Sequence, residues 1–231
     1  MRRKRYAAPP YEFYRFLATK KISNIRGLIM ASSAEEHGYF GSPKLLEVLL
    51  DDAGQAFRDL WANTESQYLR RNSVRAAFGC IEGICAVLSN EVLLKYLRGA
   101  IRLSLKEIKV IENKEAELVQ RIKKSFSAYN KLHNSNFILD TESSGFSCLR
   151  IAKRIRNNLT HPSRYSHVLI SDSDVATIAK AYLWIKDECK RLMESVIETN
   201  LQKLSVEDRT VVRNMLDKTS SAVGWAEKPN D

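Results

Sequence analysis

The sequence predicts an all-α protein, an up-and-down helical bundle with additional helical elements at its N- and C-terminal ends. Apolar residues recur at the spacing of amphipathic helices through most of the 231 residues. Segments with the alternating pattern of a strand are almost absent. Short polar connections separate the long helical segments, which favours antiparallel neighbours. An apolar content of 44% is enough for a substantial core.

The chain length fits one domain with elaborations. We expect a basic tail and an N-terminal helical extension over 1–40, and the helical bundle over 41–203. A short C-terminal helix and a loose tail follow over 204–231.

Capping and breaking residues bound the expected helices. Ser42 and Pro43 suit an N-cap and a first helical position, and Ser171 to Asp174 have the form of a capping box. Residues 134–144 are polar and turn-like. In chain order, helices are expected at about 20–31, 42–65, 68–97 (with a candidate break near Ser89 and Asn90), 102–133 (with a break at 112–114), 145–160, 171–201 and from Ser205 onward.

Residues near the end of the expected helix 145–160 combine groups that suit phosphodiester chemistry. Arg156 supplies a planar fork of donors that matches phosphate oxygens. His161 can take or give a proton near neutral pH. Asn157 and Asn158 are poor helix-interior residues that favour helix ends. The alternative is a solvated arginine and a histidine that caps a helix end.

The spacing of this motif requires a helix end. Positions five apart on an unbroken helix point about 140° away from each other, so Arg156 and His161 would not converge. Pro162 restricts the residue before it, and the helix should therefore finish near Thr160 or His161. Such an end would free the His161 ring to turn back toward Arg156.

The Arg156, Asn157 and His161 pattern, closed by Pro162, resembles that of the HEPN superfamily of small helical bundles. The resemblance covers the motif helix, and more loosely an earlier helix with Glu82 and the long helix that follows. It implies an HEPN-like bundle that acts as a dimeric, metal-independent endoribonuclease, often a toxin or a defence effector. It also implies Asn157 as a positioning residue, and an antitoxin or other regulatory protein as a partner.

In this hypothesis His161 deprotonates the ribose 2′-hydroxyl or protonates the leaving 5′-oxygen of RNA. Arg156 stabilises the charge that develops on the phosphate. One histidine cannot easily perform both proton transfers in one step. Two copies of the motif in a symmetric homodimer would supply an acid and a base.

Glu82 is the only charged residue in an apolar stretch and therefore needs a partner. An arginine of its own helix (Arg71 or Arg75) and Arg156 are equal candidates. Gly79 and Gly83 on the same helix permit close approach of another helix. This helix and the motif helix are expected at or near the dimer interface.

The net charge of +10 is typical of chains that bind polyanions, although many basic proteins bind no nucleic acid. Arg150, Lys153 and Arg154 precede the motif at helical spacing, and Arg164 follows it. These four are the expected phosphate contacts if RNA reaches His161. The alternative is an ordinary solvated face.

Other classes of site find little support. The four cysteines lack Cys-x-x-Cys spacing, and no Cys/His cluster predicts a metal or a cofactor. Cys80, Cys85 and Cys189 are expected in the core. Without a long uncharged apolar run or a signal sequence, a cytoplasmic protein with no membrane contact is expected.

Two other functions remain open. The first is a catalytically inactive HEPN-like module that binds RNA, a nucleotide or a partner protein. The second is a structural adaptor whose apolar helix faces dock another protein.

Overall fold

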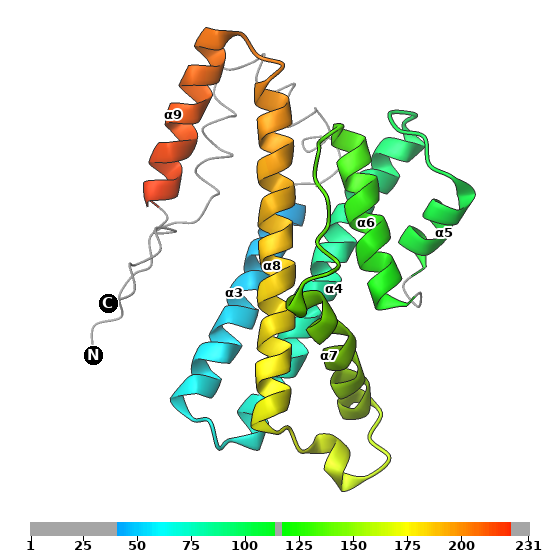
Figure 1. Ribbon diagram of the computed structural model, residues 1–231, viewed down its shortest axis with the longest axis vertical. Coiled ribbons are helices and arrows are strands. Elements are labelled where there is room, and N and C mark those ends of the chain that lie inside the picture. The colour runs from blue at the N-terminus through cyan, green and yellow to red at the C-terminus, as the bar shows by residue number, and fades with distance from the viewer. Residues whose placement is uncertain (1–40, 114–116, 223–231) are drawn as a thin grey trace. The chain divides into compact units, whose positions relative to one another are not determined.

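The computed structural model describes residues 41–113 and 117–222. Every regular element that these residues form is a helix (Figure 1). They contain seven α-helices, one 3-10 turn and no strand, which confirms the predicted all-α bundle. The expected basic tail and the helix at 20–31 lie outside the described residues. The elements are α3 (Gly41–Ala62), α4 (Gln67–Leu97), α5 (Leu105–Glu112), α6 (Leu118–His133), α7 (Ser144–Thr160), η2 (Tyr165–Val168), α8 (Asp172–Leu201) and α9 (Val206–Ala222).

Most predicted boundaries agree with these elements. The break between α5 and α6 is confirmed, and Ser171 and Asp174 form the reciprocal capping bonds expected at the start of α8. The candidate break near Ser89 was wrong, because α4 is continuous there. The Ser89 hydroxyl lies 2.8 Å from that of Ser125 on α6, so its polar group is satisfied inside the bundle.

The chain divides into two compact units, one of which is Gly41–Val196. The described part of the other unit contains the end of α8 and α9. There the Arg209 guanidinium donates to the Leu201 carbonyl at 3.2 Å, and Arg213 pairs with Glu198 at 2.9 Å. The helix expected from Ser205 is confirmed and spans 17 residues, so it is longer than expected.

Helix α4 is the central helix of the Gly41–Val196 unit and packs against α3, α6 and α7 (Figure 1). Its length and apolar composition would also suit a membrane-spanning helix. More than half of its most apolar window is buried inside the protein, as in any core helix. The absence of membrane contact remains a prediction.

Burial of the cysteines agrees with the sequence. Cys80, Cys85 and Cys189 are buried in the core. Burial raises the pKa of each of these thiols to about 12. They therefore stay protonated at neutral pH and serve as small apolar residues.

The relative directions of α4, α6 and α7 matter most for the site. Helices α4 and α6 run parallel. Ser89 of α4 contacts Ser125 of α6, and Glu91, further along α4, contacts His133, further along α6. Helix α5 provides the connection that permits this arrangement. Helix α7 runs antiparallel to α6: Glu117 at the start of α6 contacts Lys153, and Lys123 further along α6 lies beside Phe146 near the start of α7.

The connection before α7 is non-helical, as expected, but it is not only polar. Phe137 is buried in the core, and the Asn130 side chain donates to its carbonyl at 3.1 Å. The Trp184 indole donates to the Asp140 carbonyl at 3.0 Å, and buried Glu188 accepts from the Asp140 amide at 3.1 Å. These contacts fix the entry of the chain into α7.

Substitution of two glycines by alanine should change the free energy of unfolding in opposite directions. A Cβ at Gly145 would overlap Trp184 of α8 near its backbone, whereas a Cβ at Gly79 on α4 would meet no atom of the described chain. Gly145→Ala should lower the free energy of unfolding by about 1–3 kcal/mol through overpacking. Gly79→Ala should raise it by about 1 kcal/mol through helix propensity. Urea denaturation measures both, and equal effects would contradict this account of the α7–α8 contact.

Candidate functional site

Helix α7 ends where the motif requires. The Ser143 side chain caps its start by accepting from the Phe146 amide at 3.3 Å. His161 is the C-cap, and its amide donates to the Asn157 carbonyl at 2.9 Å. The predicted helix end near residues 160–161 is confirmed. His161 follows Asn157 by four residues and has left the helical conformation, and its side chain is exposed.

Arg156 is held between α7 and α4. Its Nη2 donates to Glu82 Oε1 at 2.7 Å, and its guanidinium lies 5.9 Å from the centre of the Phe78 ring. Its Nη1 also donates to Asn157 Oδ1 at 3.3 Å. Of the two partners expected for Glu82, the structure therefore selects Arg156. Arg71 instead donates to the Val168 carbonyl.

The Arg156–Glu82 pair lies at the surface. The side chains are 35% and 38% exposed, so solvent or a ligand can reach the guanidinium. A pair with this exposure stabilises the fold by about 1 kcal/mol or less. It can hold the guanidinium in one place without being essential for folding.

The remaining motif side chains extend into solvent. His161 and Asn158 are exposed, and their side chains make no hydrogen bond within the described residues. Thr160 Oγ1 donates to the Arg156 carbonyl at 2.8 Å. The sequence brings Arg156, Asn157 and His161 to one helix end, but no contact joins the His161 ring to Arg156 in this structure.

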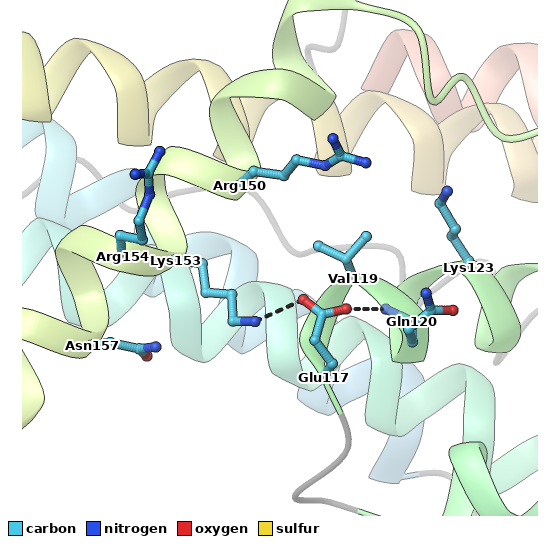
Figure 2. A pocket seen from close by; sticks show the side chains of 8 residues that line it. All are labelled: Glu117, Val119, Gln120, Lys123, Arg150, Lys153, Arg154 and Asn157. Atoms are coloured by element: carbon cyan, nitrogen blue, oxygen red, sulfur yellow. Dashed lines mark hydrogen bonds and ion pairs between the residues drawn. The ribbon is translucent and has the colours of Figure 1, made fainter.

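A basic pocket, with a volume of about 490 Å³, lies between α6 and α7 (Figure 2). Four of its lining residues follow the helical spacing of one α7 face, and four come from the start of α6. They are Arg150, Lys153, Arg154 and Asn157 of α7, with Glu117, Val119, Gln120 and Lys123 at the start of α6.

Contacts hold most of the cations of the basic pocket in place. Lys123 Nζ and the Arg150 guanidinium lie 5.1 and 5.3 Å from the centre of the same ring, that of buried Phe146. Lys153 Nζ donates to Glu117 Oε1 at 2.7 Å, as Figure 2 shows. Of the four cations that line the basic pocket, Lys153 is the one that pairs with the Glu117 carboxylate within the described residues.

Glu117 is the one carboxylate among the residues that line the basic pocket. It is the N-cap of α6, and its Oε2 accepts from the Gln120 amide at 3.0 Å. Partial burial raises its pKa, but the hydrogen bonds from Lys153 and Gln120 outweigh burial and hold the pKa below its usual value. Glu117 is therefore an anion at neutral pH.

Three of the four expected phosphate contacts line the basic pocket, and the fourth lies elsewhere. Arg164 precedes η2, and its Nε donates to His167 Nε2 at 2.7 Å. Arg164 is not among the residues that line the basic pocket.

Sequence reasoning missed the contribution of α6. Nothing in the pattern around Glu117, Gln120 and Lys123 distinguishes these residues from a solvated helix start. Only the antiparallel packing of α6 on α7 brings them to the basic residues of the motif helix. For the same reason, the sequence could not predict that Lys123 and Arg150 lie against the same Phe146 ring.

The described part of the chain contains no group of three His, Cys, Asp or Glu side chains placed to hold a metal ion. Comparison with protein-family models, with curated proteins and with solved structures found no match.

Proposed function

We propose that this protein is a metal-independent endoribonuclease that acts as a homodimer. One observation carries the proposal: α7 presents an Arg156 held by Glu82, an exposed His161 one turn beyond Asn157, and a basic pocket on the Asn157 face. A cation, a titratable ring and an electropositive approach are the groups that metal-free RNA cleavage uses.

Each residue has a distinct role in this proposal. His161 exchanges a proton with the 2′-hydroxyl or with the leaving 5′-oxygen, because its exposed ring is free to reach a ligand. Arg156 binds the oxygens of the scissile phosphate with the donors that Glu82 and Asn157 leave open. Asn157 positions the Arg156 guanidinium through its Oδ1.

Exposed apolar side chains near the motif support a second copy as partner. Ile151 on α7 is 45% exposed, and Tyr165 and Leu169, at and just after η2, are 77% and 43% exposed. The η2 turn packs against α7. A two-fold contact here would cover apolar surface and bring two His161 rings near each other.

The resemblance of the motif to that of the HEPN superfamily remains part of this proposal. An all-helical bundle with the Arg156–His161 motif at a helix end is what that resemblance implies. A role as a toxin or a defence effector, with an antitoxin or other regulatory partner, would follow from it.

The test is cleavage of generic single-stranded RNA by the purified chain in EDTA. We expect cleavage, products that end in a 2′,3′-cyclic phosphate or its hydrolysed form, and no cleavage of DNA of the same sequence, because DNA lacks the 2′-hydroxyl. Sedimentation at micromolar concentration should show a dimer. A monomeric protein that never cuts RNA would end the proposal.

A second candidate is an RNA-binding module without catalysis. The Glu82 carboxylate already neutralises part of the Arg156 charge, which favours this candidate. The basic pocket could bind phosphates without any contribution from His161. Tight RNA binding by a wild-type dimer that leaves RNA intact in every buffer would select it.

A further inference from the structure

Two cations of the basic pocket are fixed from opposite helices. Lys123 of α6 and Arg150 of α7 lie against the same buried Phe146 ring, at 5.1 and 5.3 Å from its centre. Neither of them forms an ion pair within the described residues, so their charge is not neutralised by a carboxylate. Side chains held in this way lose little freedom when an anion binds between them.

The chemistry of the lining selects phosphate groups rather than bases. Four cations, two carboxamides, one valine and one carboxylate line the basic pocket, and no aromatic ring is among them. Stacking of bases on exposed rings, the usual device for holding unpaired bases, is therefore missing. Cationic side chains and amides bind phosphate oxygens without regard to sequence.

The position of the basic pocket relates it to the motif. Asn157 lines the basic pocket and also accepts from Arg156. The His161 backbone, at the C-cap of α7, lies about 6 Å of helix rise beyond Asn157. A nucleic-acid strand with a phosphate beside Asn157 would therefore have its next linkage near Arg156 and His161.

The Glu117 carboxylate already binds donors of the basic pocket that a phosphate group could also bind. One carboxylate oxygen accepts from Lys153 at 2.7 Å, and the other accepts from the Gln120 amide at 3.0 Å. An ammonium and a helix-start amide are donors that also bind phosphate oxygens. An incoming phosphate would meet this carboxylate as a competitor of like charge.

We propose that the basic pocket between α6 and α7 binds the sugar–phosphate backbone of single-stranded RNA next to the cleavage site, and that Glu117 competes with phosphate for Lys153. This inference rests on the proposed function for its ligand. It adds residues of α6 to the RNA-binding surface and assigns them a role independent of base identity.

The test measures binding of a short single-stranded 2′-O-methyl RNA, which keeps the phosphates but lacks the reactive hydroxyl. The double variant Lys123→Gln with Arg150→Gln removes the two cations on Phe146. We expect affinity to fall at least about tenfold and the slope of log K against log salt to decrease by about 1.4, or 0.7 for each lost contact.

A matched control separates a local site from general charge. Lys109→Gln with Lys180→Gln makes the same change in net charge at two exposed lysines that do not line the basic pocket. This control should leave affinity and salt slope nearly unchanged. Equal losses of RNA affinity in both double variants, or no loss in the Lys123 and Arg150 double variant, would overturn the proposal. Circular dichroism checks that all variants remain helical.

Glu117→Gln should act in the opposite direction. Glutamine keeps an acceptor for the Gln120 amide but removes the charge that competes for Lys153, so RNA should bind several-fold more tightly. Unchanged or weaker binding in a variant that melts like wild type would contradict the role of Glu117.

Cleavage assays on the same variants distinguish this inference from the proposed function. Binding that depends on Lys123 and Arg150, in a protein that never cuts RNA, would support the basic pocket and reject the nuclease. Cleavage by the wild type, with undiminished RNA binding by the double variant, would support the nuclease and reject the role of the basic pocket. Absence of any RNA binding would reject both.

Discussion

His161→Ala is expected to lower the rate of RNA cleavage by about 100-fold or more, since loss of a proton-transfer group typically has an effect of this size. The side chain is exposed beyond the end of α7 and makes no hydrogen bond within the described residues. Its removal should therefore change the free energy of unfolding by no more than about 0.5 kcal/mol. Single-turnover cleavage and urea denaturation measure the two quantities.

His167→Gln is the matched control for that variant. His167 lies six residues further along the chain and accepts from Arg164, apart from the motif. The control should keep cleavage near the wild-type rate. If both variants lose activity equally, His161 has no special role. If His161→Ala cuts RNA at the wild-type rate, the proposed mechanism is wrong.

Arg156→Ala should also lower cleavage by about 100-fold or more, because it removes the cation that would stabilise the developing phosphate charge. The bundle should survive this change. The Arg156–Glu82 pair is about one-third exposed on both sides, and such pairs contribute about 1 kcal/mol or less. Thermal melts should show a small shift, and cleavage assays a large loss.

Glu82→Gln tests whether Arg156 acts only by holding α4 to α7. This variant removes the charge of Glu82 and leaves an amide oxygen that can still accept from the Arg156 guanidinium. If Arg156 stabilises the reacting phosphate, Glu82→Gln should keep most of the cleavage that Arg156→Ala loses. Equal losses of cleavage and of stability in both variants would assign Arg156 a structural role.

The sequence by itself determined the helices and the position of the motif. Amphipathic spacing set α3 and α7 because helical period and apolar burial are local properties of the chain. Pro162 set the end of α7, since a proline restricts the residue before it whatever the surroundings. The place of His161 at that end followed directly.

Tertiary structure decided which side chains meet. Equal candidates for the partner of Glu82 were resolved only when α7 packed on α4 and brought Arg156 within 2.7 Å. The partner of the Ser89 hydroxyl inside α4 was likewise a hydroxyl of another helix, that of Ser125. Each of these contacts joins residues far apart in the chain, and local pattern carries no information about such distances.

The basic pocket likewise combines features that the sequence predicted with features that only the fold decided. Arg150, Lys153 and Arg154 could be recognised as one basic face of a helix from their spacing alone. The sequence could not show that α6 runs parallel to α4 and antiparallel to α7, which sets Lys123 and Glu117 opposite that face. Helix direction in a bundle depends on the packing of whole apolar faces, so this part of the site was decided by the fold.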